Sequence, residues 1–168
     1  VLNGTQLQYV SGAGTFGRLT IQNTLGVELL SDIDLQRNLI LTTGILSLKE
    51  FMLSLSTSSS IEGTGFGSSK MITTDGVFSS LGIRKYYASY SNATPATFTY
   101  PVGTLNKYTP AVLSYTNNSR TGYLRINVVN DNHPAVLDAN NVLSYYWELE
   151  SGALEAFNGG LVLNYLQA

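Results

Sequence analysis

Cysteine is absent from the sequence, which excludes disulfide bonds, thiol catalysis and thiolate metal sites. Charged residues make up only 12% of the chain, against about 25% in a typical soluble domain, and the net charge is -2. Because the few basic residues are scattered, nucleic acid is not expected as a partner. No run of about 18 apolar residues occurs, so direct insertion into a membrane is not expected either.

The residues that are present suffice for a folded domain. The 168 residues are 43% hydrophobic and 11% aromatic, which is enough for an apolar core without a metal or a disulfide. Ser, Thr, Asn and Gly supply most of the polarity and favour short strands joined by turns. The sequence begins with Val1 and shows no signal peptide, as expected of a processed chain or an excised fragment.

Apolar and polar residues alternate in the first half of the chain. The alternating runs are 19–21, 27–29, 33–35, 39–41, 46–48 and 53–55. A period of two places one side of each short strand toward a core. Turn-forming residues such as Asn23 and Asp32 separate the runs. The pattern therefore predicts a series of short strands.

Glycines recur with a longer period in the same region. Gly26, Gly44, Gly63 and Gly82 follow one another at intervals of 18, 19 and 19 residues. About 20 residues form one coil of a β-solenoid, in which each coil is stable only against its neighbours. A meander of hairpins is the alternative, but no Asn-Gly or Asp-Gly dipeptide lies between residues 19 and 62. The sequence predicts β-solenoid coils over residues 1–80.

The second half is rich in aromatic residues and predicts a different arrangement. Most of the tyrosines and the single tryptophan, Trp147, follow residue 85. Strands are expected at 83–90, 96–100, 110–116, 122–129, 142–150 and 160–166. Their spacing predicts an antiparallel β-sandwich over residues 81–168. The fold class is therefore all-β, with short parallel solenoid coils followed by a sandwich; only 48–53 and 153–157 have a composition that would also suit a turn or two of helix.

Several phrases of the sequence, in their order along the chain, resemble those of a known family. The segment 39–48, LILTTGILSL, is similar to a repeated rung of that family. The phrase FTYPVG at 98–103, followed by YTP at 108–110, is similar to the one that usually comes next. The segments 145–149, YYWEL, and 161–165, LVLNY, resemble the strands after it. Across residues 19–166, the chain resembles large secreted adhesin-like surface proteins of Bacteroidota.

This resemblance implies a location and a role. Members of that family are often exported by the type IX secretion system, and some serve gliding motility. The sorting domain that they carry at the C-terminus is not evident in these residues, so export by this route is an implication for a parent chain. The resemblance implies a non-catalytic structural or adhesive module, extracellular or at the cell surface. Its expected partners are neighbouring domains of the parent protein, glycans or other surface proteins.

A carbohydrate-binding accessory module of a secreted polysaccharide-active enzyme is the alternative function. Tyr86, Tyr87 and Tyr90 place two rings on one face of an expected strand and one on the other, and exposed tyrosines stack on sugars. Tyrosine is equally an ordinary strand residue. An enzyme proper, such as a β-helical polysaccharide lyase, would need more coils and a basic residue beside carboxylates, and neither is evident.

The sequence predicts no catalytic, cofactor-binding or metal-binding residue. The single histidine, His133, has Asp131 and Asp138 nearby, but no G-x-S-x-G motif presents a nucleophile for a triad. A solvated loop histidine is therefore expected. Calcium ligands are conceivable in Asp131-Asn132 and in the stretch 138–141, DANN, although turn formation explains the same residues.

Two pairs of acidic residues on expected strands have the spacing that the paired carboxylates of a glycosidase would need. Asp32 and Asp34 share one face of an expected strand, and so do Glu148 and Glu150. In both cases an outward, solvated face is the favoured interpretation. Alternation then directs Tyr145, Trp147 and Leu149 into the core, so truncation of either glutamate should change stability by roughly 0.5 kcal/mol or less.

Overall fold

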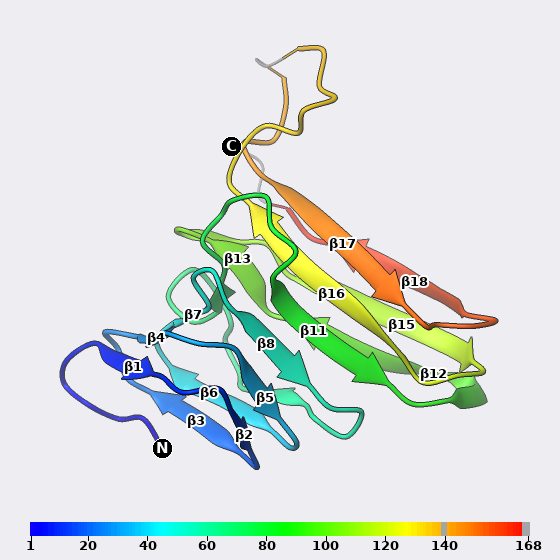
Figure 1. Cartoon of the computed structure of the whole chain (residues 1–168). Coiled ribbons are helices and arrows are strands. Elements are labelled where there is room, and N and C mark those ends of the chain that lie inside the picture. Colours follow the sequence, from blue (N-terminus) through cyan, green and yellow to red (C-terminus); the bar gives the residue numbers. More distant parts are fainter. Residues whose placement is uncertain (139–140, 166–168) are drawn as a thin grey trace.

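The computed structural model describes residues 1–138 and 141–165, and it is all-β (Figure 1). No helix is present in these residues, and thus none that is long and apolar enough to span a membrane. The two segments with helix-forming composition, 48–53 and 153–157, form turns and part of a strand instead. Lys49, Ala153 and Ala156 have φ angles of 51°, 57° and 47°, in the left-handed region that a right-handed helix excludes.

The first half forms coils of three short strands each, as the alternation predicts. The first coil contains β1 (Gln8–Val10), β2 (Gly14–Phe16) and β3 (Leu19–Gln22). The second contains β4 (Val27–Leu29), β5 (Ile33–Leu35) and β6 (Leu39–Thr43), and the third β7 (Leu46–Ser47), β8 (Met52–Leu55) and β9 (Ile61–Glu62). A fourth coil begins with β10 (Ile72–Thr73) and β11 (Gly82–Tyr87).

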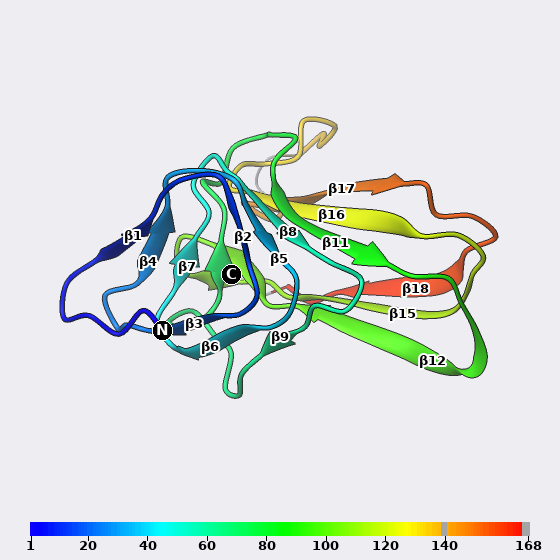
Figure 2. The same ribbon diagram turned by 60° about the horizontal axis from the view of Figure 1, so that its bottom comes forward.

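Successive coils pair in parallel, so the prediction of a solenoid is confirmed. Equivalent strands stack along three faces, which surround a common interior (Figure 2). We name the sheets by these faces: sheet I begins β1-β4-β7-β10, sheet II begins β2-β5-β8-β11, and sheet III is β3-β6-β9.

The glycine period marks one corner of the coils, with one exception. Gly26, Gly44 and Gly63 follow the third strand of their coils, and all three have positive φ angles. A Cβ atom at Gly44 would collide with the carbonyl of Asn23 in the preceding coil, so close stacking of coils requires glycine there. Gly82 opens β11 at a different corner, because the longer loop of residues 74–81 precedes that strand.

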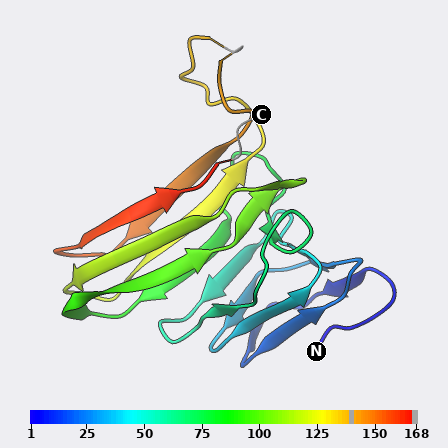
Figure 3. The same ribbon diagram turned by 180° about the vertical axis from the view of Figure 1, so that it is seen from behind.

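The second half extends sheets I and II and adds a separate antiparallel sheet. Its strands are β12 (Tyr90–Tyr100), β13 (Val102–Thr104), β14 (Lys107–Tyr108), β15 (Ala111–Asn118), β16 (Gly122–Val129), β17 (Tyr146–Gly152) and β18 (Asn158–Leu163). The antiparallel strands β12-β15-β18 form sheet IV (Figure 3). Sheet IV faces the antiparallel part of sheet II, β11-β16-β17, as in a sandwich (Figure 2).

The outer strand of sheet IV is irregular. The register of β12 against β15 shifts between Ser91 and Ala96, where the strand contains Pro95. The side chain of Asn92 accepts a hydrogen bond from Thr94 N within this bulge, at 2.9 Å. Proline and bulges both interrupt the row of backbone groups that an end strand offers to a neighbour.

The solenoid and the sandwich share strands. β11 pairs in parallel with β8 of the third coil and antiparallel with β16 of the sandwich. β13, from the second half, pairs in parallel with β10 and so extends sheet I. The change of pairing falls at β11, next to the boundary predicted between residues 80 and 81, and that boundary stays a prediction.

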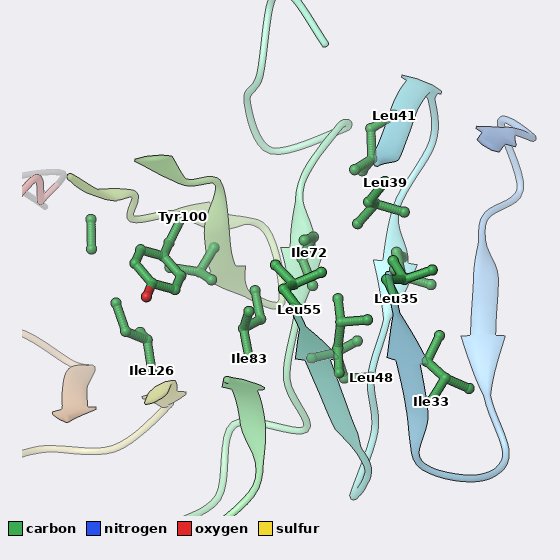
Figure 4. Close-up of a cluster of buried hydrophobic side chains, with 14 of the residues drawn as sticks. Ile33, Leu35, Leu39, Leu41, Leu48, Leu55, Ile72, Ile83, Tyr100 and Ile126 are labelled. Atoms are coloured by element: carbon green, nitrogen blue, oxygen red, sulfur yellow. The ribbon is translucent and has the colours of Figure 1, made fainter. Parts of the chain in front are cut away.

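One apolar core extends through both halves (Figure 4). Ile33, Leu53, Ile83 and Ile126 are neighbours across β5, β8, β11 and β16, and each is at most 1% exposed. Burial of each such side chain contributes about 1.5–3 kcal/mol. The ladder of buried side chains therefore joins coil to sandwich without a break.

Trp147 packs against this core, as predicted, but its neighbour Leu149 does not. The indole Nε1 of Trp147 donates a hydrogen bond to the Thr109 carbonyl at 2.9 Å, and its ring meets the buried Tyr145 edge-on. Leu149 pairs with Ile126 and lies on the inner side of the sheet, yet it is 43% exposed. The prediction that Leu149 is buried is wrong, because β17 is the end strand of sheet II.

Truncation of Trp147 and of Leu149 should have different effects on stability, because only Trp147 is packed against the core although both lie on the inner side of the sheet. We expect Trp147→Ala to lower the free energy of unfolding by about 3 kcal/mol, because it removes a packed ring and orphans the Thr109 carbonyl. Leu149→Ala should cost about 1 kcal/mol or less. Urea unfolding followed by circular dichroism measures both, and equal losses would contradict this difference in burial.

A lysine lies inside the junction between solenoid and sandwich. Lys85 faces inward on β11 and is 3% exposed. Its Nζ donates to the carbonyls of Ser56 and Thr57 at 2.5 and 3.0 Å and lies over the rings of Tyr87 and Phe98. Burial lowers the pKa of Lys85 from 10.5 to about 8.

This lysine should give stability an unusual pH dependence. Between about pH 8 and 10.5 the unfolded chain holds a proton at Lys85 that the folded protein releases, so the free energy of unfolding rises with pH. Burial raises the pKa of Tyr87 and Tyr100, whose ionisation in the unfolded chain near pH 10 opposes this rise. We therefore expect a gain between pH 8 and about 10.

Urea unfolding at pH 7, 8, 9 and 9.7 measures this gain. Lys85→Met should abolish it, because methionine keeps the volume and does not titrate. Lys49→Met is the control, since Lys49 is exposed, and it should keep the wild-type profile. A wild-type profile that is flat or falls from pH 8 to 9.7 would refute the assignment.

Candidate functional site

The outer face of sheet II, which points away from the core, carries most of the charged side chains that pack together. Cross-strand pairing aligns Asp34 of β5, Ser54 of β8, Arg84 of β11, Arg125 of β16 and Glu150 of β17 in one row. The five residues are widely separated along the chain. Sheet register alone brings them side by side.

Arg125 organises this row. Its side chain is 2% exposed although it lies on the outer face. Its guanidinium forms ion pairs with Glu148 at 3.1 Å and with Glu150 at 3.0 Å, and it donates to the carbonyls of Ser79 and Leu81 at 3.0 and 2.9 Å. Because a charge removed from water must be fully paired, these four contacts are what permit its burial.

The same network fastens the loop of residues 74–81 across the sheet. Asn127 donates to the carbonyls of Val77 and Ser79 at 3.0 and 3.4 Å, and Glu148 accepts a hydrogen bond from Ser79 N at 3.2 Å. At the start of the loop, the Thr74 hydroxyl donates to the Val128 carbonyl at 2.8 Å. The loop therefore forms a fixed wall along the outer face.

Two adjoining hollows lie beside this wall, and we call them together the outer trough. One has a volume of about 410 Å³, and its lining includes Asp32, Asp34, Ser54, Arg84 and Glu150 beside the loop. The other, of about 420 Å³, shares Asp34 and Ser54 and reaches Tyr86. β5, β8 and β11, which supply most of these residues, lie side by side in Figure 1. The trough is open; the lining of the first hollow is mainly polar, and that of the second is about equally polar and apolar.

The charges of the trough are held in defined positions. The Arg84 guanidinium lies 4.8 Å from the centre of the Tyr123 ring, and its Nε is buried without a hydrogen-bond partner. The Tyr123 hydroxyl donates to Glu150 at 2.7 Å. This hydrogen bond and the Arg125 guanidinium lower the pKa of the Glu150 carboxyl, whereas the same bond to Glu150 raises the pKa of Tyr123. Glu150 is therefore a fixed anion, which is opposite to the raised pKa of a general acid.

The structure changes the interpretation of the acidic strand residues. Asp32 and Asp34 are exposed, as expected, but they line the same hollow as Glu150. The Asp32 carboxylate also accepts a hydrogen bond from Met52 N at 2.9 Å. Glu148 and Glu150 do lie on the outer face, yet the expectation of a merely solvated pair is wrong, because both hold Arg125. Sequence reasoning missed Arg84 and Arg125, since no local pattern marks them.

The other sequence candidates lie outside the trough. His133 is exposed in the connection between β16 and β17, which projects from the body in Figure 1. Its Nδ1 accepts a hydrogen bond from Ala135 N at 3.2 Å, and its ring meets Tyr146. Within the same connection, Asn141 donates to Asp138 at 2.7 Å, while residues 139–140 of the expected calcium stretch lie outside the described residues. In the part of the chain that the structure describes, no three His, Asp or Glu side chains are grouped to hold a metal ion.

The three tyrosines considered for sugar stacking do not share one strand. β11 ends at Tyr87 and β12 begins at Tyr90, and Tyr87 is buried with its hydroxyl 2.6 Å from that of Tyr100. Tyr90 packs on Tyr115. Only Tyr86 lines the trough, where it meets Tyr123 edge-on.

Removal of Glu148 should test the Arg125 network. We expect Glu148→Ala to lower the free energy of unfolding by roughly 3 kcal/mol, because it removes one of the two carboxylates that pair with the buried guanidinium, takes an acceptor from Asn127 and leaves Ser79 N without one. Glu148→Gln keeps one acceptor and should lose about half as much.

Glu28→Ala is the matched control for this measurement. Glu28 pairs with Lys49 at 2.8 Å, but 47% of the lysine side chain is exposed, so the loss should be less than about 1 kcal/mol. Chemical unfolding curves compare the three variants. Equal small losses for Glu148→Ala and Glu28→Ala would show that the network does not hold the loop.

Comparison with known proteins adds no assignment to this geometry: no protein-family model matches the chain, and neither a curated protein nor a solved structure matches it significantly.

Proposed function

We propose that the chain is a non-catalytic structural and adhesive module of a large bacterial protein that is secreted or displayed at the cell surface. The observation that carries the proposal is the sharing of β11 between the solenoid and the sandwich. A shared strand leaves no linker between the two parts, so they move as one body. A stiff unit of this kind suits a spacer that holds a binding surface away from the cell.

The positions of the first and last strands support a role in series with other domains. In Figures 1 and 3 the strands of the first coil and β18, the last strand that the structure describes, lie on opposite sides of the molecule. Neighbouring domains attached at the two ends would thus be held apart by the whole module. Export by the type IX system and a part in gliding motility remain implications of the family resemblance for a parent protein.

The low charge and the polar outer surface agree with this role. The side chains that pack on the outer face of sheet II are fixed by hydrogen bonds rather than left mobile, as with Arg125 and Asn127. Fixed polar groups on a rigid scaffold favour recognition. Arg125 and Asn127 are themselves buried, and they fix the loop that borders the exposed polar groups of this face. Those exposed groups are the surface that gives the module its adhesive part.

Cooperative unfolding tests the rigid-body proposal. Leu41 is completely buried in β6 of the second coil, whereas Trp147 reports on the sandwich. We expect Leu41→Ala to lower the free energy of unfolding by about 3 kcal/mol. The loss should be the same whether unfolding is followed by Trp147 fluorescence or by circular dichroism. Leu30→Ala, at a position that is 50% exposed, is the control and should have little effect.

Two results would count against the module. A tryptophan transition that Leu41→Ala leaves unchanged would show that coil and sandwich unfold independently. Antibodies to the chain should also label intact cells that produce the parent protein. Labelling that requires permeabilised cells would contradict a surface location.

A further inference from the structure

The outer trough has the construction of a binding site rather than of a chance depression. Its side chains come from β5, β8, β11 and β17, and one wall is the loop that Arg125 and Asn127 hold in place. These elements belong to one sheet, so the positions of Asp34, Ser54 and Arg84 are set by the strand register. A ligand would meet a prearranged surface and would order few side chains on binding.

Arg84 is the residue that points to a ligand. Its guanidinium is oriented by the Tyr123 ring, and its Nε, buried, has no acceptor. Among residues 1–138 and 141–165, Arg84 takes part in no ion pair, although Asp34 and Glu150 line the same hollow. A planar donor group held in this way is suited to hydrogen-bond an oxygen-rich ligand.

The charges of the trough select the class of ligand. Asp32, Asp34 and Glu150 repel an anion, and Arg84 opposes a cation at the floor. Arg125 offsets only one of the two carboxylates that it pairs with, Glu148 and Glu150, so the negative charge of the other remains beside the trough. An uncharged molecule that both donates and accepts hydrogen bonds satisfies carboxylate, guanidinium and the Ser54 hydroxyl together.

The form of the trough indicates an extended molecule. The two hollows share Asp34 and Ser54 and are open, so a chain can lie along them and leave at either end. Tyr86 lines the second hollow and offers aromatic surface to the apolar face of a sugar ring.

We propose that the outer trough binds an uncharged oligosaccharide segment, with Asp34 accepting and Arg84 donating hydrogen bonds to neighbouring hydroxyl groups. The inference rests on the proposed adhesive role and assigns it a ligand class. It places recognition on the outer face of sheet II, away from Trp147 and from the tyrosines that pack in the sandwich.

Binding to defined polysaccharides tests the proposal. The probes are hydroxyethylcellulose, galactomannan and soluble starch as uncharged chains, polygalacturonate as an acidic chain and poly-L-lysine as a basic one, each immobilised on a biosensor. We expect at least one uncharged chain to be bound, and bound more tightly than polygalacturonate and poly-L-lysine. Asp34→Ala and Arg84→Gln should each weaken that binding about tenfold or more, as expected for loss of a hydrogen bond to a charged group.

Matched controls keep the test specific. Arg18→Gln and Asp131→Ala remove the same charges at exposed positions outside the trough and should bind as the wild type does. Failure of all uncharged chains to bind, binding that the two trough variants leave unchanged, or a preference for poly-L-lysine would each overturn the proposal; the last would indicate a basic protein partner. Thermal melts of the same variants show whether they are folded.

The module proposal and this inference can fail separately. If the protein binds no uncharged glycan but its fluorescence and circular dichroism transitions coincide, glycan binding at the trough is refuted. The proposal of a rigid module then stands. Glycan binding by a protein whose coil and sandwich unfold separately would support the trough and refute the rigid spacer.

Discussion

The structure depends on the double pairing of one strand. β11 accepts the parallel register of the coils on one side and the antiparallel register of the sandwich on the other. An unprotected last coil would expose a row of backbone groups and its apolar interior. Antiparallel β16 and β17 cover that edge, and Ile126 continues the column of Ile33, Leu53 and Ile83. The sandwich thus acts as the cap of the solenoid.

The same pairing generates the polar side of the molecule. Once β8, β11 and β16 are in register, the side chains between the inward-facing ones must meet on the outer face. Ser54, Arg84 and Arg125 fall in one row for this reason. Lys85, the residue next to Arg84, must then face inward, where carbonyls and aromatic rings surround its ammonium group. Apolar core, buried lysine and outer trough all follow from one register.

Local patterns in the sequence predicted the strands and the solenoid because these depend on nearest neighbours. The alternation at Ile33–Leu35 and at Leu39–Leu41 marks burial directly, and both pairs are completely or almost completely buried. β1 and β2 were missed, since Tyr9 is exposed and the segment around Gly14 lacks large apolar residues. The glycine period identified the corners but also included Gly82, whose corner differs.

The candidate site could not be predicted in this way. The trough joins Asp34, Arg84 and Glu150, which are far apart in the sequence, and their alignment requires the order of strands in sheet II. Alternation correctly placed Glu148 and Glu150 on the outer side of the sheet. No residue near them in the sequence indicates that they form ion pairs with Arg125. The sequence left open whether Tyr87 is an exposed ring or an ordinary strand residue, because its contacts with Tyr100 and Tyr115 cross between strands. Pairing between distant strands is the information that one sequence lacks.

The bulge in β12 has a consequence for copies of this chain at high concentration. A regular end strand invites the end strand of an identical neighbour, and side-by-side copies would then merge into a continuous sheet. Pro95 and the register shift between Ser91 and Ala96 break the repeat of donors and acceptors along the longest end strand of this molecule. The bulge therefore hinders crowded copies from pairing along this edge.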